Sequence, residues 1–263
     1  MTTLPVHDFG HSMDRPVVNA IDGHDLTMAL RRGVDDFLAM PTHALFIGLI
    51  YPIVGIVLAT AAFGTEILPL VFPLAAGFAL IGPFAAIGLY ELSRRREQGL
   101  STDWAYAFAN LTRPAASALA GFGLLLLAVF ACWLVAAQGI YWALYGASVP
   151  ESIFAFAEDV LTTPRGWALI VIGNLVGFAF SLMVLALSVV SVPMLVDRDV
   201  DMLTAIETSL AAFRRNPRTL TAWGFTVAGL LILGSLPLFV GLAVVMPILG
   251  HATWHLYRRV IPA

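Results

Sequence analysis

Two histidines near the C-terminal end, His251 and His255, have a spacing that suits ligation of a metal ion or a haem. Residues four apart on a helix share one face, so both imidazoles could reach the same ligand. His43, expected at a similar depth at the start of the first long apolar segment, could complete a cluster of three. The alternative is that the two histidines only anchor a helix end at the lipid headgroups, beside Trp254 and Tyr257. We favour this alternative, because no cysteine or carboxylate pattern accompanies them, and we expect no cofactor.

A second group with possible chemistry consists of arginines that we expect on one side of the membrane. This basic rim contains Arg94, Arg95, Arg96, Arg113, Arg214, Arg215 and Arg218. Each arginine near an anionic leaflet contributes about 1 kcal/mol of attraction. The rim could bind lipid or a partner protein, or it could serve only to orient the chain. The sequence leaves both interpretations open.

Asn174 is the clearest polar residue inside an apolar segment, within the sequence Gly173-Asn174-Leu175-Val176-Gly177. Its GxxxG spacing lets two helices approach closely, so we favour helix packing over a contact with substrate. Ion- and proton-coupled transporters carry charged groups within their spans, and these apolar segments carry almost none. The sequence also lacks the Walker, GxSxG, HExxH and paired-carboxylate patterns, so we do not expect an enzyme.

The composition indicates an integral membrane protein. Hydrophobic residues make up 59% of the 263 residues and charged residues only 12%, against roughly 25% charged in an ordinary soluble protein. The single cysteine, Cys132, excludes a disulfide scaffold. The net charge of −3, without a separate basic domain, argues against nucleic acid as a partner.

Six apolar segments are predicted to cross the bilayer, since each has close to or more than the ~20 residues that a ~30 Å hydrocarbon core requires. They cover about residues 43–63, 67–91, 114–147, 164–196, 218–235 and 238–257. All fourteen basic residues are arginines, and this topology places thirteen of them on one side and only Arg165 on the other. By the positive-inside rule, both termini then lie in the cytoplasm.

A pattern of amphipathic helix, proline and membrane hairpin occurs three times along the chain. The amphipathic segments are residues 25–40, 102–113 and 199–216, and each precedes a proline that starts the next helix. In the first segment, Asp35 and Asp36 fall mainly on the polar side. In the third, Asn216 is expected to cap the helix that follows.

We therefore predict an all-α, polytopic membrane protein with six transmembrane helices arranged as three hairpins, each preceded by a cytoplasmic interfacial helix. A polar tail covers residues 1–24, and the three units cover residues 25–100, 101–198 and 199–263. The middle unit carries an insertion on the outer side, residues 149–163. Its apolar periodicity predicts a helix that lies on the outer membrane surface.

Two longer motifs resemble a family of bacterial integral membrane proteins known as domain of unknown function 2189. The first runs from Gly82-Pro83 through residues 90–99, YELSRRREQG, and the second covers residues 247–259, PILGHATWHLYRR. The resemblance extends over about residues 20–260 and implies a six-span protein of the bacterial inner membrane. Some members carry a label that links them to cytochrome c oxidase. This chain lacks the six histidines of an oxidase catalytic subunit, so that label would imply an accessory or assembly role.

Three functions remain open at this point. The leading hypothesis is a non-enzymatic inner-membrane scaffold, accessory subunit or assembly factor, with the bilayer and another membrane complex, such as a respiratory oxidase by the family label, as partners. The first alternative is a transporter or channel for a neutral or hydrophobic solute. The second is a redox accessory protein that binds haem or metal through His43, His251 and His255.

Overall fold

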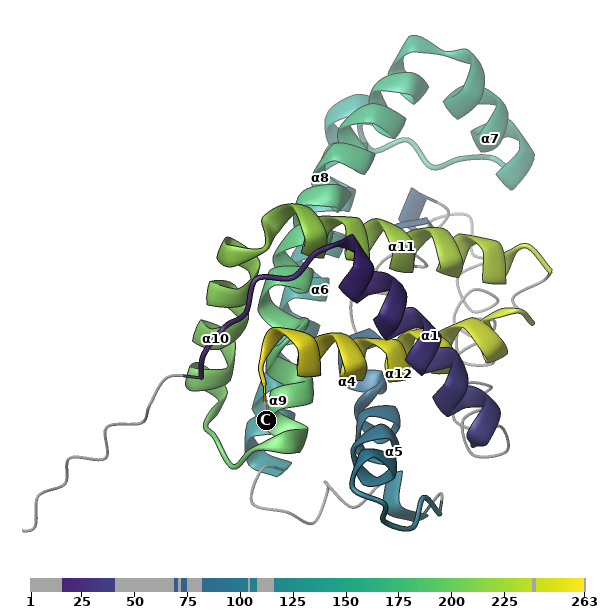
Figure 1. Cartoon of the computed structure of the whole chain (residues 1–263). Helices are drawn as coiled ribbons and strands as arrows, with labels where there is room; N and C mark the ends of the chain where they lie inside the picture. The colour runs from purple at the N-terminus through teal and green to yellow at the C-terminus, as the bar shows by residue number, and fades with distance from the viewer. Residues whose placement is uncertain are drawn as a thin grey trace, which may run out of the picture.

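The computed structural model describes residues 16–40, 69–70, 72–74, 82–103, 105–107, 116–237 and 240–262, and these residues form helices and turns without a strand. The all-α prediction is thereby confirmed for the described part of the chain. The helices, labelled in Figure 1, are α1 (Gly23–Ala39), α4 (Gly82–Ala85), α5 (Ile87–Glu97), α6 (Ala116–Tyr145), α7 (Ile153–Thr162), α8 (Pro164–Ser188), α9 (Ser191–Asp197), α10 (Met202–Arg215), α11 (Pro217–Ser235) and α12 (Leu242–Val260).

Two helical stretches of the described residues are long and apolar enough to cross a membrane. They are Ala116–Tyr145, which is α6, and Pro164–Asp197, which combines α8 and α9. These stretches coincide with the third and fourth predicted spans. The reason is compositional, because α6 has no charged residue and α8 has only Arg165, at its first turn.

Helix α11 covers the fifth predicted span, whereas α12 begins four residues after the start of the sixth and ends three residues beyond it; the two helices pack against each other. In Figure 1, α8 runs up the picture while α11 and α12 run across it, so this pair is inclined steeply to α8. The first predicted span and the middle of the second, residues 75–81, fall outside the described residues. The arrangement of six spans as three hairpins therefore stays a prediction.

The fourth predicted span is not one straight helix, because it breaks at Val189 and Val190. The ring of Pro193 would collide with the carbonyl of the residue four positions earlier, which is Val189. The chain therefore turns there and restarts as α9. Ser209 of α10 stabilises the turn, since its hydroxyl oxygen accepts a hydrogen bond from the Val190 N–H at 3.2 Å.

Helices occur where the first and third amphipathic segments were predicted, but two of the assigned residue roles were wrong. Asp36 of α1 is buried rather than on a solvated polar side, because it meets polar side chains of α5 and α12. Asn216 stands at the N-cap position of α11 without capping it. Its amide instead bonds the segment before α1, accepting from the Ile21 N–H at 2.8 Å and donating to the Asn19 carbonyl at 2.9 Å. The middle amphipathic segment lies mostly outside the described residues.

A helix also forms within the predicted outer insertion. This helix, α7, begins at Ser152, whose hydroxyl accepts from the Ala155 N–H at 3.2 Å. It folds back on α8 at Gly166, where any side chain would collide with the backbone of Val160. Arg165 forms an ion pair with Asp159 at 2.7 Å, which ties the first turn of α8 to α7. Whether α7 lies on the membrane surface stays a prediction.

Candidate functional site

The C-terminal half of α12 is the part of the molecule where buried polar side chains converge. Helices α1, α5 and α9 all pack against α12. His251, His255 and Trp254 are buried there among apolar side chains. Polar groups in such surroundings require partners. They find them in two clusters, one around Asp36 and one around Glu97 and Asp197.

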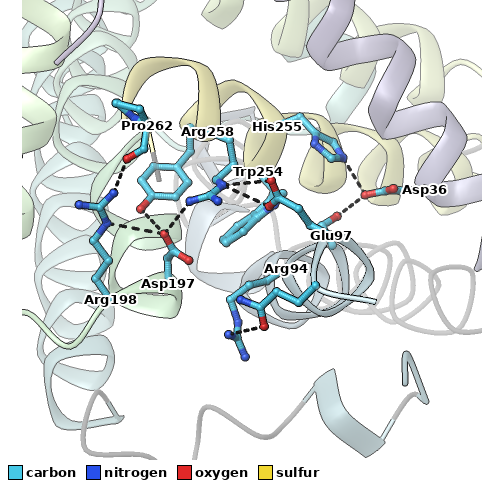
Figure 2. A network of polar contacts seen from close by, with 12 residues as sticks. Asp36, Arg94, Glu97, Asp197, Arg198, Trp254, His255, Arg258 and Pro262 are labelled. Atoms are coloured by element: carbon cyan, nitrogen blue, oxygen red, sulfur yellow. Dashed lines mark hydrogen bonds and ion pairs between the residues drawn. The ribbon is translucent and has the colours of Figure 1, made fainter. Parts of the chain in front are cut away.

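The Asp36 cluster joins α1, α5 and α12 through Asp36, Ser93, Arg96, His251 and His255. Asp36 Oδ2 accepts hydrogen bonds from the Ser93 hydroxyl at 2.5 Å and from His255 Nε2 at 2.9 Å. Asp36 Oδ1 forms an ion pair with Arg96. Figure 2 shows the bond between His255 and Asp36, which bridges α12 and α1. One carboxylate thus holds three helices together.

The hydrogen bonds also determine which nitrogen of each histidine carries its proton. The single Ser93 hydroxyl proton goes to Asp36, so His251 Nδ1 donates to Ser93 Oγ, at 2.7 Å. His255 donates from Nε2, because its partner is a carboxylate. Among the described residues, this leaves His251 Nε2 and His255 Nδ1 buried without a hydrogen-bond partner.

The two histidines therefore share a face of α12 and enter one cluster. Metal-binding histidines commonly donate their other ring N–H to a carboxylate, as His255 does here. Within the part of the chain that the structure describes, no three histidine, cysteine or acidic side chains are grouped to hold a metal. His43 lies outside the described residues, so the three-histidine cluster stays a prediction.

The charge state of Asp36 reflects this environment. Burial by itself would raise the pKa of Asp36. The hydrogen bonds from His255 and Ser93, together with the charges of the two histidines when protonated, outweigh burial and lower the pKa below its ordinary value. The carboxylate therefore stays ionised at neutral pH. Its charge is balanced directly by Arg96.

The second cluster, formed by Glu97, Asp197, Trp254, Tyr257 and Arg258, joins α5, α9 and α12 (Figure 2). Arg258 bridges the two carboxylates, with Nε 3.1 Å from Glu97 Oε2 and Nη1 3.2 Å from Asp197 Oδ2. The Trp254 indole donates to Glu97 at 3.2 Å, and the Tyr257 hydroxyl donates to Asp197 at 2.8 Å.

Sequence reasoning missed Asp36, Ser93, Glu97 and Asp197 as members of a site. A signal was present on α12, where His251, His255 and Arg258 recur at intervals of four and three residues and so form one polar face. A polar face on a helix assigned to lipid indicates buried partners elsewhere in the protein. The sequence did not say which carboxylates those partners are.

The structure divides the arginines of the basic rim into two groups. Arg94 and Arg95 pair with the buried Glu91, at 2.7 and 3.8 Å, and Arg96 pairs with Asp36. The others described are the α10–α11 arginines, Arg214, Arg215 and Arg218; they are exposed and form no ion pair with a described residue. Arg113 lies outside the described residues.

The residues of the predicted helix-packing motif on α8 also have different surroundings. Gly177 lies against the Trp133 ring of α6, where a Cβ would come within 3.1 Å. A Cβ at Gly173 would meet no atom within 4 Å. Asn174 is exposed, and its amide donates to the Ile170 carbonyl at 2.7 Å. One half of the motif thus packs inside the molecule and the other half faces outward.

A cavity of about 300 Å³ lies between α4, α5, α8, α11 and α12. Its described lining is mostly apolar and includes Tyr90, Leu185, Trp223, Leu249 and Phe225. Its volume lies at the lower end of the range for ligand pockets, roughly 300–1,000 Å³.

A family model described as "Predicted integral membrane protein (DUF2189)" matches residues 71–197. This segment of the chain is similar to the DUF2189 family. No curated protein and no solved structure gives a significant match to the chain. The family match and the two long apolar stretches, α6 and α8–α9, both indicate an integral membrane protein.

The DUF2189 segment runs from the region before α4 to the end of α9 and so contains only part of each polar cluster. It supplies Ser93, Arg96, Glu97 and Asp197. Asp36 comes from α1, and the histidines and Arg258 come from α12. The two clusters therefore connect the DUF2189 segment to the helices that precede and follow it.

Proposed function

We propose that the chain is a non-enzymatic protein of the bacterial inner membrane that acts as a scaffold, accessory subunit or assembly factor of a membrane complex. The proposal rests on the first part of the Gly173–Gly177 motif of α8, which faces outward. Asn174 lies mid-helix in an apolar stretch and is exposed, between the half-buried Gly173 and Leu175, which is 64% exposed. A face of this kind suits a second transmembrane helix.

The physical argument concerns the Asn174 amide. Its NH₂ already donates to the Ile170 carbonyl, whereas no described residue donates a hydrogen bond to its side-chain carbonyl oxygen. An amide carbonyl in hydrocarbon is costly unless a donor reaches it. A neighbouring helix can supply that donor, and Gly173 allows its backbone to come close. The polar clusters are consistent with a structural role, because they connect α1, α5, α9 and α12.

Replacing Asn174 by leucine is expected to weaken association with the partner complex about three- to tenfold, the range for one interhelical hydrogen bond. The measurement is the mass and composition of the complex after extraction in mild detergent, by native electrophoresis and light scattering. Wild type should carry a second protein in fixed stoichiometry, and Asn174→Leu should lose it on dilution.

Ser181→Ala is the matched control on the same helix, because the Ser181 hydroxyl already donates to the Gly177 carbonyl at 2.9 Å. This variant should retain the partner. A wild-type protein that is extracted only as a solitary monomer would contradict the proposal.

The orientation in the membrane is a second part of the proposal, with both termini in the cytoplasm. It is supported by the crowding of arginines at residues 94–96, 214–218 and 258–259, opposite the α7 region. Fusions of a cytoplasmic reporter after Gln98 and at the C-terminus should be active, and fusions near Ser152 should be active only with a reporter for the outer side. The same reporter active at Gln98 and Ser152 would overturn this topology.

Transport of a neutral or hydrophobic solute is the second candidate function, and the cavity between α8, α11 and α12 favours it. A transport path must meet water at some stage. In a Cys132→Ser background, single cysteines at Thr221 and Thr253 of the cavity lining would then react with a water-soluble thiol reagent. Failure of both to react would remove this candidate and leave the scaffold proposal standing.

A further inference from the structure

The cavity has a mouth between α8 and α11. Phe178 and Phe225 both line the cavity, yet they remain 43% and 62% exposed. Their rings stack with centroids 5.7 Å apart. The other large exposed side chains of α8 near Phe178 are the apolar Leu175 and Met183, so we expect the mouth to face the bilayer interior.

The lining favours a hydrocarbon chain as occupant. Among the described lining residues, none is charged. Three of the lining hydroxyls donate within their own helices, Ser181 to Gly177, Ser188 to Val184 and Thr253 to Leu249. Their protons are therefore not offered to a ligand. A flexible apolar chain can fill such a space without leaving a polar group of its own unpaired.

Arg218 lies in the first turn of α11, about one turn before Thr221, which lines the cavity. It precedes Thr221 and Phe225 by three and seven residues, so the three side chains share one face of the helix. The distance along the helix axis from Arg218 to Phe225 is about 10 Å. A lipid with its phosphate at Arg218 would therefore reach the mouth with the upper part of its acyl chain.

The charges of the α10–α11 arginines are available for a ligand. Arg94, Arg96 and Arg258 are each held by a carboxylate. Arg214, Arg215 and Arg218 are exposed and form no ion pair within the described part of the chain. Guanidinium groups bind phosphate through paired hydrogen bonds. Positive charge at the edge of an apolar cavity is complementary to an anionic phospholipid.

We infer that the chain has a binding site for an anionic phospholipid of the bilayer, with one acyl chain in the cavity and the phosphate at Arg218, assisted by Arg214 and Arg215. The site gives one role, lipid binding, to part of the basic rim. The inference goes beyond the proposed function and does not depend on it, since a scaffold and a carrier could both hold such a lipid.

The test uses the full chain purified in detergent, with phosphatidylglycerol and phosphatidylcholine of identical acyl chains as probes and native mass spectrometry as the readout. Wild type should retain phosphatidylglycerol about fivefold better than phosphatidylcholine. Arg218→Ala should remove most of that preference. Ala228→Phe, which places a ring in the cavity, should reduce retention of both lipids.

Arg32→Ala is the matched control, because Arg32 is also exposed but lies on α1, away from the residues that line the cavity. It should leave the preference unchanged. Equal retention of the two lipids by wild type, or equal effects of Arg218→Ala and Arg32→Ala, would overturn the inference.

A second measurement needs no variant and so does not depend on the folding of a mutant. Phosphatidylglycerol with a photoreactive group on its acyl chain is added to membranes that contain the wild-type chain. Cross-links are expected in peptides that cover residues 178–189 and 221–231, which line the cavity. Cross-links confined to other segments would contradict the site, whatever the outcome for the scaffold proposal.

Discussion

Replacement of Asp36 by alanine is expected to lower the free energy of unfolding by about 3 kcal/mol, the lower end for removing one partner of a buried ion pair. The Asp36 side chain is only 5% exposed and accepts from Ser93 and His255 while pairing with Arg96. Without it, the His255 ring and the Ser93 hydroxyl lose their acceptor inside the protein. Arg96 is 40% exposed and can return to water, which keeps the effect from being larger.

The measurement is unfolding in detergent or lipid, compared with Asp35→Ala. Asp35 is the adjacent carboxylate on α1 and is exposed, so its removal should change stability by less than about 0.5 kcal/mol. Equal stability of the two variants would show that the Asp36 cluster does not hold α1, α5 and α12 together.

The same cluster predicts a pH dependence with a definite sign. Asp36 has a lower pKa in the folded chain than its ordinary value. Its contribution is therefore complete above the unfolded carboxyl pKa of about 3.9 and is lost as the pH falls through the folded pKa. Wild type should lose stability below about pH 4 more steeply than Asp36→Asn, which cannot ionise. Parallel curves for the two proteins would contradict the assignment.

Replacement of Gly33 by valine is the second change with a large expected effect, a loss of at least about 3 kcal/mol. A Cβ at Gly33 would stand 2.7 Å from the Ala252 nitrogen, the Ala252 Cβ and the Ile248 carbonyl oxygen. Backbone atoms in the middle of α12 cannot move aside, so α1 must move away. Asp36 lies one turn further along α1 and would be drawn away from His255 at the same time.

Limited trypsin digestion provides the readout, because release of α1 exposes the peptide bonds after Arg31 and Arg32. Gly33→Val should be cut there at a protease level that leaves wild type intact. Gly23→Ala is the control at the first turn of the same helix, where an added Cβ meets nothing within 4 Å. Resistance of Gly33→Val equal to that of the control would mean that the close packing of α1 on α12 is not needed.

The helices themselves could be predicted well because their signals are local. Apolar runs without charge indicated α6 and α8, and prolines indicated where α8 and α11 begin. The turn before α9 also has a local cause, because Pro193 lies within this long apolar run. The histidine part of the candidate site could also be predicted, since the spacing of His251 and His255 alone places them on one helical face.

The hydrogen-bond partners of those histidines could not be predicted from the sequence. The sequence predicted Asp36 to be solvated because it falls with Asp35 on the polar side of an amphipathic segment, and it is separated from His255 by 219 positions. The arginines of the basic rim looked equivalent for the same reason. Only the packing of α5 places Arg96 beside Asp36, while Arg218 is exposed and forms no ion pair with a described carboxylate.

The amino-acid sequence by itself determined the helical class, the apolar helices that suit a bilayer and the family segment, because hydropathy and helix ends depend on neighbours within a few turns. The tertiary structure alone decided which polar side chains are buried, which remain free for a ligand and where a cavity lies. Burial of a charge depends on partners from three separate helices, and no local pattern records where those helices meet.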